Sequence, residues 1–344
     1  MNSKRRFSDL LRFFSVLSLP KLANAALVLS SFYLSKWLRK PIQWGMPFNV
    51  SIEPTTTCNL RCPECPSGLR AFTRNTGNMS PETFDSILNQ FSKNLVWLYF
   101  YFQGEPFINP HFLHFVKKAK ERKMYTVTST NAHYITEETA NKIIDSGLDR
   151  IIISIDGLDQ KTYEQYRVGG NLDKVIKGVK TLVAAKKKRN AKAPYILFQM
   201  LVVKPNEHQI SDLYSLAKEL DVDDVLLKTA QVYDYKNGNS LIPENEKYSR
   251  YIKQLDGTYK IKNKLLNHCW KLWHSCVLTW DAYLVPCCFD KDAQYKMGNI
   301  IDTPFLKIWQ SDLYKSFRTR ILKERAQIDI CSNCTEGTKV WIEH

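Results

Sequence analysis

Apolar residues follow two alternating patterns between residues 46 and 230. Short continuous apolar runs predict strands buried on both faces, and stretches with apolar residues every three or four positions predict helices. The predicted strands cover residues 48–52, 95–102, 125–130, 150–155, 195–203 and 224–229. The predicted helices begin near residues 80, 111, 136, 160 and 207. This order predicts an α/β fold, a partial (β/α)6 parallel barrel, whose functional site lies at the carboxyl ends of the strands.

The first 45 residues have a different pattern, which predicts amphipathic helices in front of the barrel. Four apolar side chains recur there at the spacing of one helix face: Phe7, Leu10, Leu11 and Phe14. A second apolar run follows Pro20, and its uncharged part is too short to cross a bilayer. Two interpretations stay open for residues 1–45. The helices pack against the barrel, or they make a peripheral contact with the inner face of a membrane through Trp37 and its basic neighbours.

The chain after the barrel divides into a linker and a small domain. Residues 231–262 are polar and rich in turn-forming residues, so they predict a linker. Residues 263–344 carry six of the nine cysteines and predict a small cysteine-rich domain. Because the cysteine number is odd and the spacings resemble metal sites, a secreted disulfide framework is disfavoured and a cytoplasmic location is expected.

The net charge of +15 over 344 residues narrows the candidate partners. Four of the positive charges come from the run Lys186 to Arg189. This run lies at the end of a predicted helix, where cations complement the helix dipole. A solvated basic face explains such a charge, and attraction to an anionic substrate or membrane surface is the alternative. The sequence contains no nucleic-acid-binding motif, so nucleic acid is not an expected partner.

Three cysteines follow the first predicted strand on one turn-rich loop. Cys58, Cys62 and Cys65 are spaced C-x3-C-x2-C, and a loop can turn all three sulfurs toward one small group. A structural zinc ion takes four protein ligands, and no fourth Cys or His is nearby in the sequence. A 4Fe–4S cluster on three thiolates leaves one iron free to bind another ligand. A zinc loop, or three unrelated thiols, is the alternative.

This loop resembles the signature of the radical S-adenosylmethionine (SAM) superfamily, in which the same spacing follows the first barrel strand. The resemblance implies that Cys58, Cys62 and Cys65 hold a 4Fe–4S cluster whose open iron binds SAM. Reductive cleavage of SAM then gives a 5′-deoxyadenosyl radical, which abstracts a hydrogen atom from the substrate. Glu64 stands where the family commonly has an aromatic residue, so the adenine base must find its packing elsewhere.

The resemblance extends to a short motif at the end of the second strand. Gly104, Glu105 and Pro106 match a G-E-P motif that binds the SAM amine in the family. A carboxylate suits an ammonium group because hydrogen bonds between charged groups are the stronger kind. Gln103 departs from the family pattern, which more often has a second glycine at that position.

Polar residues also follow the third and fourth strands. Ser129 and Asn131 are two residues apart, as are Ser154 and Asp156, so each pair lies on one face. By resemblance, these residues contact SAM, with Asp156 suited to its ribose; turn chemistry explains each pair equally well when taken alone. Gln199 lies inside an apolar strand and needs a partner, which is the cofactor, the substrate or a neighbouring side chain.

The cysteine-rich tail resembles the SPASM or shortened twitch extensions of the same superfamily, which carry auxiliary 4Fe–4S clusters. The resemblance implies one auxiliary cluster, held by Cys269, Cys287, Cys331 and Cys334. Cys276 and Cys288 are left over, and Cys288 is an alternative to Cys287. Structural zinc on the same four thiolates is the competing interpretation.

The resemblance implies an oxidoreductase that removes a hydrogen atom from its substrate and passes the remaining electron to the auxiliary cluster. The substrate is a small molecule or a peptide, and a peptide maturase using the same chemistry is the first alternative. A non-catalytic protein that carries zinc or a cluster is the second. The expected electron donor is a protein such as flavodoxin or ferredoxin.

Overall fold

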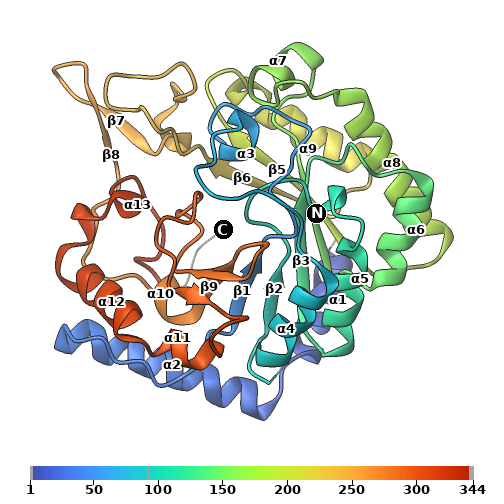
Figure 1. The fold of residues 1–344 in the computed structure, drawn as a ribbon. Coiled ribbons are helices and arrows are strands. Elements are labelled where there is room, and N and C mark those ends of the chain that lie inside the picture. The colour runs from blue at the N-terminus through green and yellow to red at the C-terminus, as the bar shows by residue number, and fades with distance from the viewer. Residues whose placement is uncertain (1–2, 92, 341–344) are drawn as a thin grey trace.

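The computed structural model describes residues 3–91 and 93–340, so both ends of the chain, residues 1–2 and 341–344, lie outside the described part. Its centre is a mixed sheet in the order β11-β10-β9-β1-β2-β3-β4-β5-β6. Strands β1 to β6 are parallel neighbours in chain order, as predicted for the partial barrel. Helices cover the outside of this curved sheet (Figure 1).

The strands of the main sheet are β1 (Asn49–Ile52), β2 (Trp97–Tyr99), β3 (Tyr125–Thr130), β4 (Arg150–Ser154), β5 (Tyr195–Val202), β6 (Asp224–Thr229), β9 (Ser275–Leu278), β10 (Tyr283–Val285) and β11 (Gly298–Asn299). The helices up to the last barrel strand are α1 (Ser3–Ser15), α2 (Leu19–Leu38), α3 (Pro66–Leu69), α4 (Pro81–Phe91), α5 (Phe112–Glu121), α6 (Glu137–Ser146), α7 (Gln160–Tyr166), α8 (Leu172–Lys188) and α9 (Ile210–Glu219). The later helices are α10 (Lys271–His274), α11 (Phe305–Trp309), α12 (Asp312–Glu324) and α13 (Asp329–Ser332). Short 3-10 turns cover Pro106–Ile108, Glu207–Gln209, Glu246–Tyr248 and Arg325–Gln327.

The cysteine-rich tail does not form a sheet of its own. Strand β9 pairs with β1 in parallel, with Val50 opposite Cys276, and β10 and β11 continue the sheet by antiparallel pairing. The barrel and the tail therefore share one hydrogen-bonded sheet, although Val50 and its partner Cys276 are 226 positions apart in the sequence. Residues 231–262, predicted as a linker, contain the antiparallel pair β7 (Tyr251–Lys253) and β8 (Tyr259–Ile261).

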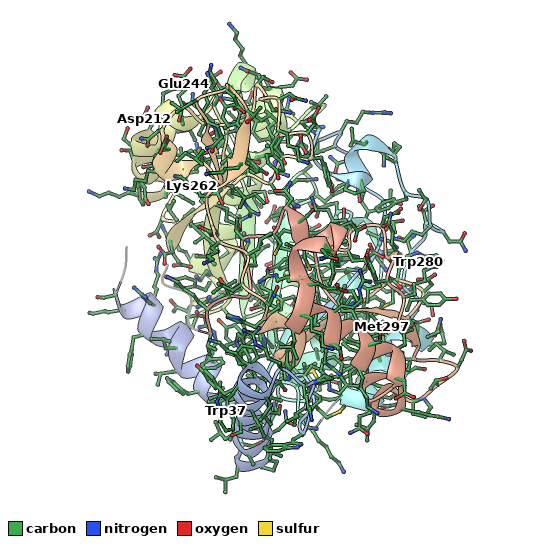
Figure 2. All side chains as sticks on the ribbon, turned by 90° about the vertical axis from the view of Figure 1, so that its left-hand side faces the viewer. Trp37, Asp212, Glu244, Lys262, Trp280 and Met297 are labelled. Atoms are coloured by element: carbon green, nitrogen blue, oxygen red, sulfur yellow. The ribbon has the colours of Figure 1, made fainter. Side chains whose placement is uncertain are left out.

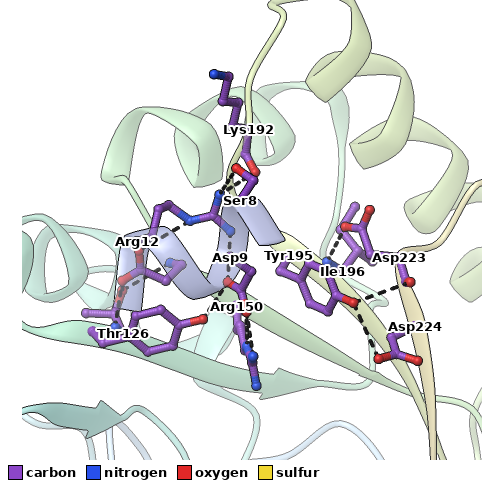
Figure 3. A network of polar contacts seen from close by, with 12 residues as sticks. Ser8, Asp9, Arg12, Thr126, Arg150, Lys192, Tyr195, Ile196, Asp223 and Asp224 are labelled. Atoms are coloured by element: carbon purple, nitrogen blue, oxygen red, sulfur yellow. Dashed lines mark hydrogen bonds and ion pairs between the residues drawn. The ribbon is translucent and has the colours of Figure 1, made fainter. Parts of the chain in front are cut away.

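Helix α1 closes the amino-terminal end of the barrel with its polar side (Figure 3). Asp9 is 1% exposed and accepts hydrogen bonds from Tyr125 Oη at 2.5 Å and Arg150 Nε at 2.7 Å. Arg12 Nη2 reaches the same carboxylate at 2.8 Å. Phe13 packs among the apolar side chains inside the barrel. This arrangement is the first of the two interpretations for residues 1–45.

Helix α2 connects the barrel to the tail and lies beneath the C-terminal helices in Figure 1. Its buried Phe32 contacts Trp270 and Trp273, with ring centroids 5.1 and 5.6 Å away. Asn24 fixes the chain that enters β1, because its amide exchanges two hydrogen bonds with the backbone of Met46, at 2.8 and 2.9 Å. Among the described helices, none is long and apolar enough by itself to cross a membrane.

Candidate active site at the carboxyl ends of the barrel strands

The three-cysteine loop follows β1 and lies at the carboxyl end of the barrel strands. Its start is held by Thr56, whose backbone amide donates to the Gly77 carbonyl and whose hydroxyl accepts from the Gly77 amide, at 3.1 and 2.9 Å. Burial, together with the nearby Glu105, Cys62 and Cys65, raises the pKa of the Cys58 thiol to about 12. The structure thus brings the three predicted thiols into one partly buried group.

Gly104 joins this loop to the second strand. Its φ is +73°, and an added Cβ would lie 2.2 Å from the Thr55 carbonyl oxygen, so only glycine fits the approach. The next residue, Glu105, donates its backbone amide to the Thr57 carbonyl at 2.8 Å. The G-E-P motif and the cysteine loop are therefore docked backbone to backbone. Gln103, which departs from the family pattern, contacts the loop with its side chain: its Oε1 lies 3.6 Å from Cys65 Sγ.

Glu105 is a buried carboxylate, and all its hydrogen bonds within residues 3–91 and 93–340 come from neutral donors. Its oxygens accept from the Thr130 hydroxyl at 2.7 Å and from the backbone amides of Asn131 and Phe107 at 2.8 and 3.4 Å. Burial raises the pKa of Glu105 to about 7. A buried carboxylate without a positive partner in its hydrogen bonds is suited to a cationic ligand, because such a ligand replaces the lost hydration.

Arg167 is a member of the site that the sequence analysis missed. It directly follows α7, and its Nη1 lies 3.9 Å from Cys62 Sγ while its Nε donates to Asp156 at 2.5 Å. Both oxygens of the fully buried Asp156 carry bonds from the protein, since the other accepts from the Leu201 amide at 2.6 Å. The structure thus gives Asp156 an ion-pairing role, and its contact with ribose stays a prediction. The available signal in the sequence was an arginine eleven residues after the strand-end Asp156.

The remaining predicted residues come together on adjacent strands. Ser129 and Ser154 have their hydroxyl oxygens 3.4 Å apart, and Ser154 lies opposite Gln199 in the β4–β5 register. The Gln199 Oε1 atom is buried and has no hydrogen-bond partner in the described part of the chain. Asn131 donates to Asn59 at 2.8 Å and its Nδ2 lies 4.0 Å from Cys58 Sγ. Polar side chains therefore extend from the cysteine loop across the ends of β3, β4 and β5, and the Gln199 Oε1 atom is available to bind a ligand.

The tail brings a second set of thiols together. Burial and the nearby Cys269 together raise the pKa of Cys331 to about 12 and that of Cys334 to about 11. A hydrogen bond between Cys287 and Cys288 raises the pKa of Cys287, with burial and the nearby Cys334 and Cys269 adding to it. The four predicted ligands are thus neighbours in space.

The two leftover cysteines have different surroundings. Cys276 is buried in β9 within the main hydrophobic core and lies opposite Val50 of β1. Cys288 is exposed, and its pKa is lowered by the hydrogen bond with Cys287 and by the nearby Lys271. This placement favours Cys287 over Cys288 as the ligand.

Arg325 and Gly337 support the tail thiols and were also missed. The buried Arg325 has its Nη2 3.5 Å from Cys334 Sγ. Gly337 has a φ of +77°, and an added Cβ would lie 2.4 Å from Cys269 Sγ. A cluster needs several thiolates close together, and these repel one another. The Arg325 guanidinium offsets that repulsion and donates toward a ligand sulfur.

The donor chemistry of both thiol sets fits iron–sulfur clusters. Three and four thiolates are the ligands that such clusters take. In the described residues, no three His, Cys, Asp or Glu side chains lie close enough together for a single metal ion. Zinc holds its thiolates about 2.3 Å away, whereas a cluster spreads them around four irons. By donor chemistry alone the thiolates fit a cluster at each set, and the four tail thiolates also fit zinc.

Two family models match the chain in the order of these two sites. The radical SAM superfamily model matches residues 52–217, and the SPASM model, an iron–sulfur cluster-binding domain, matches residues 269–335. The chain belongs to the radical SAM superfamily. This radical SAM enzyme uses SAM and a 4Fe–4S cluster in its first domain and carries an auxiliary iron–sulfur domain behind it.

Curated relatives are distant and differ in their activities. The tungsten-containing aldehyde ferredoxin oxidoreductase cofactor-modifying protein of Pyrococcus furiosus is 24% identical, covering 83% of this chain and 86% of the relative. The PqqA peptide cyclase of Bradyrhizobium diazoefficiens is 25% identical over 58% of this chain and 51% of its own length. This radical SAM chain thus spans about half of the cyclase.

Solved structures show the same fold. SuiB of Streptococcus suis bound to S-adenosylmethionine has a TM-score of 0.61 at 18% identity, covering 84% of this chain and 71% of SuiB. BtrN in complex with AdoMet and 2-DOIA has a TM-score of 0.52 at 18% identity, covering 85% of this chain and 94% of BtrN. Both structures support the assignment of a radical SAM barrel followed by an auxiliary domain.

Proposed function

We propose that this enzyme oxidatively modifies a peptide or protein substrate by hydrogen-atom abstraction. The observation that carries the proposal is Glu105, a buried carboxylate with neutral hydrogen-bond donors, docked through Gly104 onto a group of three thiols. The peptide class is supported by the curated peptide cyclases, which match the barrel part of the chain.

Two charged residues beside the first thiol set, Glu105 and Arg167, would bind the ammonium and carboxylate groups of SAM. Cys58, Cys62 and Cys65 would hold the 4Fe–4S cluster. Glu105 would accept hydrogen bonds from the ammonium group, and the Arg167 guanidinium would face the carboxylate of the same methionyl end. The two charges are close enough that Arg167 lowers the pKa of Glu105, in opposition to the effect of burial. Opposite charges at this separation recognise an amino-acid group.

The chain's other polar residues would orient the cofactor and the substrate. Ser129, Ser154 and Gln199 offer hydroxyl and amide groups on adjacent strands. Asp156 would position Arg167 through their ion pair. When bound, the cofactors supply one-electron chemistry, namely a 5′-deoxyadenosyl radical that takes a hydrogen atom and an auxiliary cluster that accepts the electron left after the substrate also loses a proton. A flavodoxin or ferredoxin would supply the initial electron.

Charged residues near the second thiol set narrow the substrate class. Lys228 ends β6, and burial lowers its pKa, with Lys271 and Arg250 lowering it further and Glu336 opposing them. Lys271 forms an ion pair with Glu336 at 3.0 Å. Lys271 also lies near the Cys287 and Cys288 thiols, so these cations balance the second thiol set as well as Glu336. Positive charge beside that set also suits a substrate with an anionic group, such as an acidic peptide side chain.

The first experiment measures iron content and SAM cleavage together after anaerobic reconstitution. The wild type should hold about eight irons, and both the Cys58/Cys62/Cys65→Ala and the Cys331/Cys334→Ala variants about four. Only the first variant should lose 5′-deoxyadenosine formation completely. Cys276→Ala is the matched control and should behave as the wild type. Cleavage by the Cys58/Cys62/Cys65→Ala variant would contradict the assignment of the first cluster.

The substrate class needs a separate experiment. Extract from fully deuterated cells is divided by size, and each fraction is offered to the reconstituted enzyme with unlabelled SAM. Deuterium should enter 5′-deoxyadenosine with the macromolecular fraction, and proteinase treatment should abolish the transfer. Transfer only from the small-molecule fraction would replace the peptide proposal with a small-molecule dehydrogenase.

A further inference from the structure

Helices α1 and α2 present an apolar surface that nothing in the described chain covers. On α1 the four residues of the predicted apolar stripe are all exposed, with Phe7 at 62% and Phe14 at 59%. On α2, Leu19 is 82% and Trp37 is 79% exposed. The surface, called here the N-terminal apolar face, consists of Phe7, Leu10, Leu11, Phe14, Leu19, Leu22, Leu27, Tyr33, Trp37 and Leu38. Figure 2 shows both helices at one end of the molecule, with Trp37 on α2.

The orientation of α1 is the reverse of that expected for a helix packed on a protein. Such a helix normally buries its apolar stripe and exposes its polar side. Here the polar side is buried, because Asp9 bonds to Tyr125 and Arg150 inside the barrel end. Arg5 is also paired, with Asp221 at 2.8 Å. These polar contacts fix the rotation of α1, so its apolar stripe must point away from the protein.

Charge at both ends of this face indicates what would cover it. Residues 1–45 contain eight basic residues and one acidic residue, so their net charge is +7 of the total +15. The acidic residue, Asp9, is buried, whereas Lys4, Arg6, Lys36 and Lys40 are exposed. No charged residue lies between Leu22 and Ser35. An uncovered apolar centre with cations at its ends is complementary to an anionic bilayer surface.

We propose that the N-terminal apolar face inserts into the interface of an anionic phospholipid bilayer. The aliphatic and aromatic side chains enter the acyl boundary, and the terminal lysines and arginines remain with the lipid phosphates. The two helices meet at 91°, and neither described helix is by itself both long and apolar enough to span a bilayer, so the proposed contact is interfacial. The polar contacts of Asp9 and Arg5 hold α1 on the amino-terminal end of the barrel. The carboxyl ends of the strands, where the candidate active site lies, are therefore on the side away from α1 and the bilayer.

The test is sedimentation of the full reconstituted enzyme with vesicles. The enzyme should pellet with vesicles that contain phosphatidylglycerol and stay in solution with phosphatidylcholine alone, and added salt should weaken the binding. The Phe7/Leu11/Phe14→Ser variant should bind at least about tenfold more weakly. Tyr214/Leu255→Ser removes exposed apolar side chains elsewhere and should bind as the wild type.

Two controls keep the result interpretable. Both variants should retain iron content and SAM cleavage, because none of the substituted side chains contacts either thiol set. If the serine variant loses iron or fails to fold, Trp37→Ala on α2 provides the second comparison. The proposal is overturned if the wild-type enzyme does not sediment with vesicles that contain phosphatidylglycerol. Association of wild-type molecules through this face, without vesicle binding, would overturn it in favour of a protein partner.

Discussion

At the scale of single residues, the proton on Glu105 decides when a cation can bind beside the cysteine loop. Burial raises the pKa of Glu105 to about 7, whereas an unfolded chain releases the proton near pH ~4.3. The folded, cofactor-free protein therefore binds more protons between these values. It follows that the contribution of Glu105 to the free energy of unfolding falls as the pH rises through this window.

Replacing Glu105 with glutamine tests its proposed contact with SAM. The loss of a charge-assisted hydrogen bond should weaken SAM binding by about tenfold or more, since such bonds contribute about 1.5–3 kcal/mol. Wild-type affinity should rise as the pH passes about 7, where Glu105 ionises, and the variant should lose this dependence. Equilibrium dialysis of the cluster-loaded protein on both sides of that pH measures both effects. Glu138→Gln on the exposed face of α6 serves as the control; equal affinities in all three proteins would contradict the contact.

Gly104 offers a second test at this scale. The cost of its positive φ can be measured separately from the cost of its close contact with the Thr55 carbonyl. Gly104→Ala should destabilise the protein and lower the iron content, since the new Cβ would lie 2.2 Å from the Thr55 carbonyl oxygen. Gly257 also has a positive φ, +85°, but no atom within 4 Å of an added Cβ. Gly257→Ala should therefore cost only the backbone strain, about 1–2 kcal/mol. Urea unfolding and iron analysis of the pair measure the difference, and equal costs would show that close packing at Gly104 is unimportant.

At the scale of elements, the predicted boundaries agree closely with the structure wherever local rules decide them. Residues 125–130 and 224–229 were predicted as strands and are β3 and β6. Helix α6 begins after Thr136, whose side chain caps it, and ends at Gly147 with a φ of +73°. These signals lie within a few residues of each other, so a single sequence contains them.

Such local rules could not predict contacts between residues that are distant in the sequence. The pairing of β9 with β1 joins Cys276 to Val50, and no local pattern indicates a strand's neighbour. The apolar stripe of α1 was predicted, but not its direction, because that depends on the burial of Asp9 against Arg150. Arg167 was missed for the same reason, since only folding brings it near Cys62.

Asp9 should control the docking of α1. Asp9→Ala leaves Arg150 without its partner. Because the Arg150 side chain is 38% exposed, the cost should fall below the about 3–5 kcal/mol of a fully buried pair but exceed that of an exposed pair. Asp312→Ala breaks a fully exposed pair and should cost less than about 1 kcal/mol. Urea unfolding gives the two costs, and hydrogen exchange should show faster opening of α1 only in the Asp9 variant. Unchanged exchange would mean that apolar contacts such as those of Phe13 hold the helix instead.

At the scale of the whole molecule, two functional regions occupy one sheet. The first thiol set follows β1, and β9 to β11 extend the sheet from the same strand into the tail. A shift of either region relative to the other would break the β1–β9 ladder. The two thiol sets therefore lie in a frame with little freedom to change their separation.

The order of this sheet also governs how the chain can be made. While the ribosome synthesises it, β1 emerges early, but its outer edge has no partner until residues 275–278 of β9 follow. An uncovered edge strand pairs readily with other chains, and ladders between distant segments form slowly. We therefore expect a shortened chain that ends before β9 to leave the outer edge of β1 uncovered and to aggregate rather than form a smaller enzyme.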